Sequence, residues 1–333
     1  MKVGIIGLGY WGPNMVRNLL RNHNVVSVVC CDLNLKRLES IKQQFPMVET
    51  VTDYKAILKN PSVVAVAIVT PVSTHFKLAK EALEAGKHVL VEKPMTDSVR
   101  DAQVLIDLAA QKKLTLMVDH TFIYTGAVRK IKELVQQGEL GDIFYFDSVR
   151  VNLGLFQHDV NVLWDLAPHD ISVMDYIVGQ KPVSVAAIGA SHFNTIEDMA
   201  YVTVNFEKNL IAHFHVNWLS PVKVRKILIG GSKKMIVYDD MEPSEKVKVY
   251  DKGVDLQSEE MVHRLLVQYR LGDMYAPQLD QTEALTLMCK DFIDSIISDK
   301  IPESDGVAGF NVVRILDAAQ RSLKNGGALV KIE

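Results

Sequence analysis

A lysine stands where a predicted strand ends, in the tripeptide Glu92-Lys93-Pro94 that follows the apolar run 88–91. Open parallel sheets bind ligands at the carboxyl ends of their strands, which is where this lysine is expected. An ammonium group there can hydrogen-bond a hydroxyl group that is being oxidised. The alternative is a surface lysine at the start of a loop. Pro94 fixes the turn and is a candidate for a cis peptide bond. Together with Glu92 before the lysine, it favours a functional site over a surface lysine.

A second cluster is formed by Asp165 and His169, in the segment 164–170 that opens a helical pattern. Residues four apart on a helix share one face. A carboxylate beside an imidazole can take a proton from an alcohol and pass it on. A metal site is the rival interpretation, but no further Cys, His or carboxylate has the spacing to complete one, so no metal is predicted. Capping of the helix by Asp165 is the structural alternative.

A polar stretch precedes that cluster and carries Arg150, Asn152, Gln157 and Asn161. These side chains offer hydrogen-bond donors and acceptors that could bind a polyhydroxylated, even anionic, ligand. We therefore treat the four residues as candidate substrate contacts. For any one of them, a solvated loop is an equally weighted alternative.

The first twelve residues carry the spacing of a dinucleotide-binding loop, with glycines at Gly7, Gly9 and Gly12. The loop follows a predicted strand and opens a predicted helix, as the phosphate-binding mechanism requires. Gly7 would make the tight turn, Gly9 would let the backbone approach a pyrophosphate, and Gly12 would let helix and strand pack closely. Tyr10 and Trp11 complete the candidate cofactor-binding loop. An ordinary glycine turn is the alternative.

Asp32 ends the next predicted strand, where a carboxylate can accept hydrogen bonds from both ribose hydroxyls. A negative charge there repels a 2′-phosphate, so the sequence favours NAD over NADP. Lys36 and Arg37 lie near enough to leave that preference open. Thr70, Pro71 and His75 follow a further strand and are expected at the same crevice, although His75 could equally be a solvated residue in the first turn of a helix.

Alternating strands and helices must position these residues in the first part of the chain. Apolar, β-branched runs predict strands at 3–7, 25–31, 63–69, 88–91 and 115–118. Helical patterns begin at Pro13 and cover 74–85 and about 99–110. Strands that alternate with helices indicate a parallel, doubly wound sheet.

The pattern changes near residue 142, where apolar and polar residues begin to alternate. Extended segments are predicted at 144–151, 183–188, 200–206, 210–218, 226–229 and 235–238, with a hairpin turn at 205–209. Successive strands indicate a mostly antiparallel sheet in an α+β domain. Helical patterns at 281–298 and 306–324 close the chain. The predicted domains are 1–121, a dinucleotide-binding Rossmann domain, and 122–333, a substrate-binding and oligomerisation domain whose closing helices could pack back on the first.

Composition favours a small-molecule partner. The 333 residues carry 37 basic and 40 acidic side chains, a net charge of -3, without a block of like charge, so neither nucleic acid nor a membrane surface is an expected partner. Apolar runs reach roughly eight residues, short of the ~20 needed to cross a bilayer. A strand at the amino terminus leaves no room for a signal peptide. The three cysteines suit neither a disulfide framework nor a metal pair, and we expect a reducing cytoplasm.

Together these motifs resemble those of the Gfo/Idh/MocA oxidoreductases. The resemblance rests on the segment 7–12, on Glu92-Lys93-Pro94, and on Asp165-Leu-Ala-Pro-His169, which carries Ala167 where the family usually has glycine. The closing segments 292–296 and 312–320 are also similar, so the resemblance covers nearly the whole chain. It implies a Rossmann domain, a second domain built on a large sheet, and oligomers formed through that sheet, here a homodimer or homotetramer.

The resemblance also implies roles for individual residues. Lys93 would contact the reacting hydroxyl, His169 would be the general base, and Asp165 would orient the pair. Glu92 would lie near the nicotinamide ribose, and His120, after the strand 115–118, would lie near the nicotinamide.

Within the family, the chain is most similar to nucleotide-sugar dehydrogenases that oxidise the 3-hydroxyl of UDP-N-acetylglucosamine or its uronate. The first hypothesis is therefore NAD-dependent oxidation of a UDP-linked amino sugar to a 3-keto product. A second keeps the site but takes a free polyol such as an inositol, or runs in reverse as a ketosugar reductase. A third, from another class, is a non-catalytic dinucleotide-sensing regulator, against which Lys93, Asp165 and His169 argue.

Overall fold

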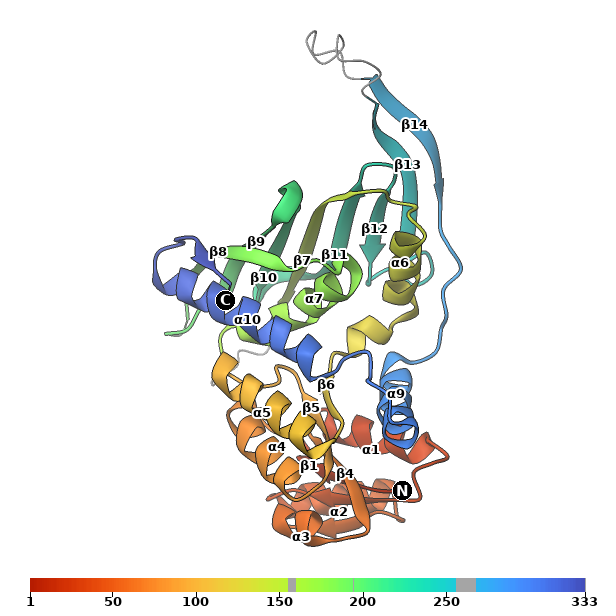
Figure 1. Cartoon of the computed structure of the whole chain (residues 1–333), viewed down its shortest axis with the longest axis vertical. Helices are drawn as coiled ribbons and strands as arrows, with labels where there is room; N and C mark the ends of the chain where they lie inside the picture. Colours follow the sequence, from red (N-terminus) through yellow and green to blue (C-terminus); the bar gives the residue numbers. More distant parts are fainter. Residues whose placement is uncertain (155–159, 194, 256–267, 333) are drawn as a thin grey trace. The chain divides into compact units, whose positions relative to one another are not determined.

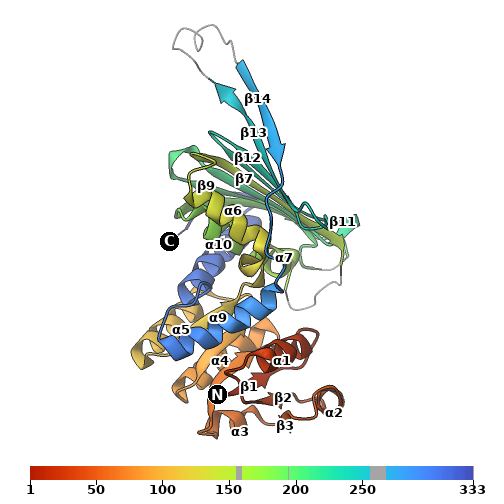
Figure 2. The ribbon, with the colours of Figure 1, turned by 90° about the vertical axis from the view of Figure 1, so that its right-hand side faces the viewer.

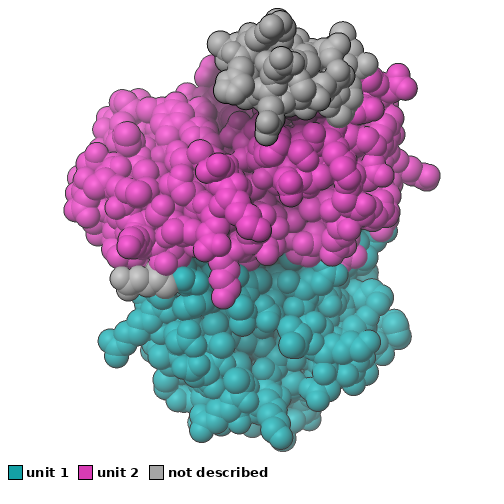
Figure 3. Space-filling view, turned by 45° about the horizontal axis from the view of Figure 1, so that its top comes forward, with its two compact units in different colours: residues 1–124, 282–314 teal, residues 125–281, 315–333 magenta. Residues whose placement is uncertain are grey.

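The computed structural model describes residues 1–154, 160–193, 195–255 and 268–332. The candidate substrate contact Gln157 lies outside these residues. The chain forms two compact units, coloured separately in Figure 3. Unit 1 consists of Met1–Tyr124 and Thr282–Arg314, and unit 2 of Thr125–Gln281 and Ile315–Glu333.

Unit 1 is built on a six-stranded parallel sheet in the order β3-β2-β1-β4-β5-β6. Its strands are β1 Lys2–Ile6, β2 Ser27–Cys31, β3 Glu49–Val51, β4 Val63–Ile68, β5 His88–Glu92 and β6 Leu116–Asp119. The order reverses between β1 and β4, so the connections leave in opposite directions and open a crevice at the carboxyl ends of the strands. The parallel, doubly wound sheet expected from the sequence is confirmed.

Helices cover both faces of this sheet. They are α1 Gly12–Arg21, α2 Leu35–Gln44, α3 Tyr54–Lys59, α4 His75–Glu84, α5 Val99–Lys112, α9 Ala284–Ser298 and the start of α10 Gly306–Lys324, with short 3-10 turns η1 Val72–Thr74 and η2 Thr121–Tyr124. In Figure 1, α4 and α5 lie together on one side of the sheet, and α1 and α9 on the other. Glu283, just before α9, links α9 to α1 by accepting hydrogen bonds from Arg17 and Asn18 of α1.

Unit 2 is built on a nine-stranded sheet in the order β14-β13-β12-β11-β7-β10-β9-β8-β15. Its strands are β7 Ile143–Leu153, β8 Pro182–Ala190, β9 Met199–Phe206, β10 Ile211–Asn217, β11 Leu219–Gly231, β12 Met235–Asp239, β13 Val247–Asp255, β14 Gln268–Tyr275 and β15 Val330–Lys331. All neighbours are antiparallel except β7 and β10, which run parallel. The mostly antiparallel sheet and the turn between β9 and β10, which holds η3 Glu207–Asn209, are confirmed.

Helices α6 Gly126–Gln136 and α7 Val162–Val178 lie on one face of this sheet, as Figure 2 shows. Along β7, the side chains of Phe146, Ser148 and Arg150 are buried while the alternate residues are more exposed. The sheet therefore has a helix-covered face and an open face. Within the described residues, no helix is long and apolar enough to cross a membrane.

Candidate active site

The glycine loop between β1 and α1 needs glycine at two positions. Gly7 has φ +99°, its N–H donates to the Cys31 carbonyl at 2.8 Å, and an added Cβ would lie 2.4 Å from the Val69 carbonyl oxygen. A Cβ on Gly12 would lie 2.6 Å from the Gly7 carbonyl oxygen. At Gly9 a Cβ would meet no atom within 4 Å, so this stretch of backbone is open to a ligand. The loop thus has the form that close approach of a pyrophosphate requires.

Asp32, buried at the end of β2, holds the loop in place. Its Oδ2 accepts from the Leu8 N–H at 2.7 Å and its Oδ1 from the Asn34 N–H at 2.8 Å. Arg37 Nη1 lies 3.5 Å from the same carboxylate. A carboxylate can accept about four hydrogen bonds, so Asp32 retains capacity for ribose hydroxyls.

A cavity of about 960 Å³ opens beside this loop in unit 1. It is lined by Gly7, Gly9, Asp32, Thr70 and Pro71 among others. Its volume and its walls, which combine apolar side chains with Asp32, Arg37 and Lys77, fit a nucleotide. The glycine cradle, the amino terminus of α1 and the acid after β2 are together the donor and acceptor set that a dinucleotide needs.

The aromatic pair of the loop lies outside the lining of that cavity. Tyr10 is 84% exposed and Trp11 is 53% exposed, and their rings meet edge to face at 5.3 Å between centroids. Two large exposed rings next to an open backbone are available to a ligand.

His75 is buried beside the ends of β4 and β5. The ring is buried, Nδ1 lies 2.9 Å from the Pro94 carbonyl oxygen, and Nε2 lies 2.7 Å from the Thr70 carbonyl oxygen. Burial lowers the pKa of this imidazole, while the two carbonyls oppose the shift. Through these two contacts His75 links the segments that follow β4 and β5, and its contact with a cofactor stays a prediction.

Lys93 is half-buried just past the carboxyl end of β5, followed by a cis bond to Pro94. The Lys93 N–H donates to Glu92 Oε2 at 2.9 Å. Glu92 is the register partner of Asp119 at the end of β6. Burial, and next the Asp119 charge, raise the pKa of Glu92 to about 8, and burial also raises the pKa of Asp119.

Asp119 and His120 lie at the carboxyl end of β6. Asp119 was not among the predicted site residues, although its place at the end of a strand beside β5 is the signal that could have identified it. His120 is buried, and neither ring nitrogen has a hydrogen-bond partner among the described residues. Burial lowers the pKa of His120 to about 3, so the ring is neutral and can offer a ligand one donor and one acceptor.

In unit 2, Asp165 and His169 lie four residues apart in α7 and are both half-buried. Asp165 Oδ2 accepts from Trp218 Nε1 at 3.0 Å, which fixes that carboxylate. Ala167, at the position where the resembling family has glycine, is buried in the helix. In the part of the chain that is described, no group of three or more His, Cys, Asp or Glu side chains could hold a metal ion.

Two candidate substrate contacts have hydrogen-bond partners within unit 2. Arg150 is buried and makes a two-pronged ion pair with Asp170, with Nε–Oδ2 at 2.9 Å and Nη2–Oδ1 at 2.7 Å. Asn161, not Asp165, caps α7, and its amide donates to Glu197 at 2.7 Å and to Gln320 at 2.8 Å. These polar groups are thus engaged within the protein, and a substrate contact by either residue stays a prediction. Asn152 lies near the end of β7 and stays a candidate.

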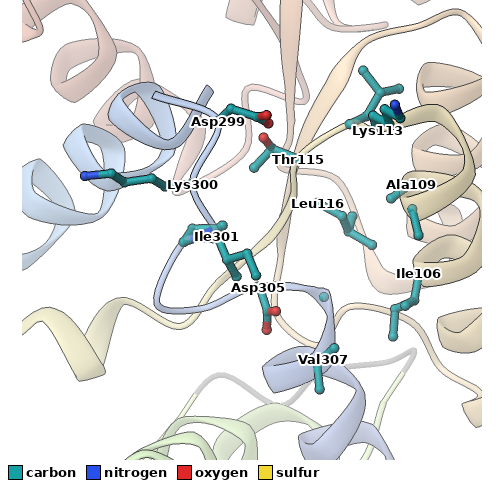
Figure 4. A pocket seen from close by; sticks show the side chains of 14 residues that line it. Ile106, Ala109, Lys113, Thr115, Leu116, Asp299, Lys300, Ile301, Asp305 and Val307 are labelled. Atoms are coloured by element: carbon teal, nitrogen blue, oxygen red, sulfur yellow. The ribbon is translucent and has the colours of Figure 1, made fainter. Parts of the chain in front are cut away.

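A smaller cavity of about 330 Å³ lies elsewhere in unit 1, between the end of α5 and the α9–α10 connection (Figure 4). Leu116 and Ile301 contribute to its lining. It adjoins the amino-terminal end of β6, whereas the glycine loop, Lys93 and His120 lie at the carboxyl ends of the strands. It is not part of the candidate site.

Comparison with known families identifies both parts of the chain. Residues 1–120 match the family described as "Oxidoreductase family, NAD-binding Rossmann fold", and residues 128–237 match the "GFO/IDH/MocA C-terminal domain".

Individual relatives are distant but cover the full length. The UDP-N-acetylglucosamine 3-dehydrogenase of Acidithiobacillus ferrooxidans is 26% identical, covering 94% of this chain and 94% of that protein. A solved structure of that enzyme has a TM-score of 0.82 at 24% identity and covers 98% of this chain and 99% of its own. The myo-inositol 2-dehydrogenase of Thermotoga maritima is 24% identical over 100% of this chain and 99% of its own. A levoglucosan dehydrogenase solved with NADH and levoglucosan has a TM-score of 0.84 at 20% identity, covering 100% and 99%. The two structural likenesses establish a common fold.

Proposed function

Because the chain belongs to the Gfo/Idh/MocA family of oxidoreductases, we propose that it oxidises a hydroxyl group of a nucleotide sugar, with Lys93 and His169 in the chemical roles. The protein is an NAD(P)-dependent oxidoreductase of sugar or polyol hydroxyls, and NAD is its cofactor. The observation that carries the proposal is the placement of Lys93 at the carboxyl end of β5, followed by the buried, neutral His120 at the end of β6.

The cofactor roles follow from the geometry of unit 1. The open backbone at Gly9 and the amino terminus of α1 would face the pyrophosphate, and Asp32 would accept from the ribose hydroxyls. The Asp32 charge disfavours a 2′-phosphate, which supports NAD over NADP. Arg37, beside Asp32, is the group that would soften this preference.

The chemistry needs a hydride acceptor, which bound NAD supplies, and groups that manage the hydroxyl proton and the charge on oxygen. Lys93 would hydrogen-bond the reacting hydroxyl and stabilise the oxygen as it gains negative charge. His169 would accept the hydroxyl proton, with Asp165, one turn earlier in α7, holding the imidazole in its working orientation. His120 would bind a polar group of the ligand through its two unused ring nitrogens.

The substrate we propose is a UDP-linked N-acetyl sugar, oxidised at its 3-hydroxyl. Support comes from the family motifs and from the relative named UDP-N-acetylglucosamine 3-dehydrogenase, which is 26% identical over 94% of both chains. The test is purified protein with NAD and a panel of UDP-sugars, free sugars and inositols, followed by NADH absorbance. We expect turnover of a UDP-N-acetyl sugar, and absence of turnover with every nucleotide sugar would contradict the proposal.

A free polyol is the second candidate, favoured by the similar myo-inositol 2-dehydrogenase. The same panel distinguishes it, because inositol would then be turned over and nucleotide sugars would not. The reverse reaction is tested with a ketosugar and NADH.

The variant Lys93→Ala distinguishes an enzyme from a non-catalytic, dinucleotide-sensing regulator. If Lys93 takes part in chemistry, NAD still binds while turnover falls by orders of magnitude. Unchanged turnover would remove Lys93 from the mechanism, and absence of turnover in the unmodified protein with every substrate would favour the sensor.

The open face of the sheet in unit 2 is the surface we propose for self-association. Tyr201 and Ile211 are exposed there, and the Tyr201 ring stacks on His215 at 4.4 Å. Light scattering with Ile211→Asp tests this: a dimer or tetramer should dissociate, and an unchanged mass would place the interface elsewhere.

A further inference from the structure

Two carboxyl groups lie side by side at the carboxyl ends of β5 and β6. Glu92 and Asp119 are partners in the parallel register, and neighbouring strands are about 4.8 Å apart. Register partners in a parallel sheet project from the same face, so both side chains occupy one small region. Asp119 is buried and Glu92 is half-buried. Ionising both carboxyl groups at this separation and with this little water is energetically unfavourable.

Among the described residues, Lys93 is the positively charged side chain that acts on this pair. Lys93 faces both carboxyls and favours their ionised forms. Burial lowers the pKa of His120 to about 3 and also lowers the pKa of His75, so the charged form of each imidazole is disfavoured. Cys289, which packs in from α9, has a thiol pKa raised well above its usual range by burial, so it is neutral too. One cation therefore faces two carboxyl groups.

Hydrogen bonds decide which of the two carries the charge. Asp119 accepts from both the backbone N–H and the hydroxyl of Thr121. Glu92 accepts from the Lys93 N–H. Asp119 accepts more hydrogen bonds than Glu92, so its carboxylate form is better stabilised. Glu92 is therefore the partner that keeps the proton, in agreement with its pKa of about 8.

We propose that Glu92 and Asp119 share one proton near neutral pH, held on Glu92, and that this pair exchanges the proton as the charge of the bound nicotinamide changes. In a Rossmann sheet the half with the acid after β2 takes the adenosine, so the half with β5 and β6 takes the nicotinamide. The positive ring of NAD⁺ favours ionised Glu92: its O–H bond breaks and the proton passes to solvent. After hydride transfer the ring is neutral, and Glu92 takes one proton back from solvent, which re-forms its O–H bond. The hydroxyl proton of the substrate, which His169 accepts in the proposed function, is released separately, so a full cycle releases one proton per hydride.

The test is calorimetry of NAD⁺ and NADH binding near pH 7 in two buffers of different ionisation enthalpy, which counts protons exchanged. NAD⁺ should release up to one proton from the unmodified protein, and NADH clearly less. Glu92→Gln and Asp119→Asn should abolish the difference, and Glu39→Gln, an exposed carboxyl on α2, should leave it unchanged. Equal proton release with NAD⁺ and NADH, or a difference that persists in both site variants, would overturn the proposal.

A second measurement needs no variant and no ligand. Infrared spectra of the protein with isotope-labelled glutamate should show a protonated carboxyl at pH 6–7 that disappears as the pH rises through about 8. Absence of that band would overturn the shared proton. The functional part of the inference rests on the proposed nicotinamide site, but both readouts are independent of any sugar. If the protein turns over no nucleotide sugar, the calorimetric and infrared results still test the shared proton. If the shared proton is not found, the nucleotide-sugar proposal is unaffected.

Discussion

The Arg150–Asp170 pair tests whether Arg150 stabilises the fold or contacts the substrate. The two side chains are 6% and 3% exposed and are joined by two hydrogen bonds. Removing one partner of such a pair leaves a buried charge without compensation, which typically costs about 3–5 kcal/mol. Arg150→Met should therefore lower the free energy of unfolding by about that amount. Adding Asp170→Leu should recover most of it, because neither charge is then buried.

The assay is urea unfolding followed by fluorescence of Trp164 and Trp218, the tryptophans of unit 2. Arg225→Met is the matched control. Arg225 is the register partner of Arg150 on β11, but its side chain is 33% exposed and 3.4 Å from Asp240, so its loss should cost at most about 1 kcal/mol. If Arg150→Met is as stable as the unmodified protein but raises KM for the sugar, Arg150 is a substrate contact after all and the reasoning is refuted.

Three further predictions concern unit 1. Gly7→Ala should abolish NAD binding, measured by calorimetry, because the new Cβ would lie 2.4 Å from a carbonyl oxygen at φ +99°; retained affinity would contradict the role of the loop. Asp32→Asn should lower the affinity ratio of NAD to NADP by at least about 10-fold, or about 1.4 kcal/mol; an unchanged ratio would show that Asp32 does not face the ribose. The raised pKa of Glu92 means that its folded form binds more protons between pH 4.5 and about 8, so it contributes stability that is present at low pH and is lost as the pH rises through about 8. Glu92→Gln should accordingly gain stability relative to the unmodified protein from pH 5 to pH 9, by at most about 5 kcal/mol, and parallel pH curves would refute the shift.

The fold was largely predictable because its signals are local. The β-branched runs at 63–69 and 88–91 and the helical pattern at 306–324 each correspond to one element, β4, β5 and α10. Strands β3, β13, β14 and β15 and helices α2, α3 and α6 were missed. β13 begins Val-Lys-Val-Tyr and β14 is equally polar, so neither offers the apolar run that marks a buried strand.

The sequence placed Gly7, Asp32 and Lys93 at strand ends, and the structure has them there. The sequence does not reveal which face of a strand a polar residue occupies. Arg150 shares the helix-covered face of β7 with Phe146 and finds its partner twenty residues later. A single sequence shows the charges but not that pairing. Asp119 was missed because its proximity to Glu92 follows from the strand register, which a single sequence does not show.

Hydride transfer from the 3-position of a nucleotide sugar is the central claim, and isotope transfer tests it directly. UDP-N-acetylglucosamine carrying deuterium at carbon 3 is incubated with the protein and NAD, and the NADH formed is examined by mass spectrometry. The account predicts one deuterium in the nicotinamide ring of NADH. Unlabelled NADH, or no NADH from any nucleotide sugar, would contradict it.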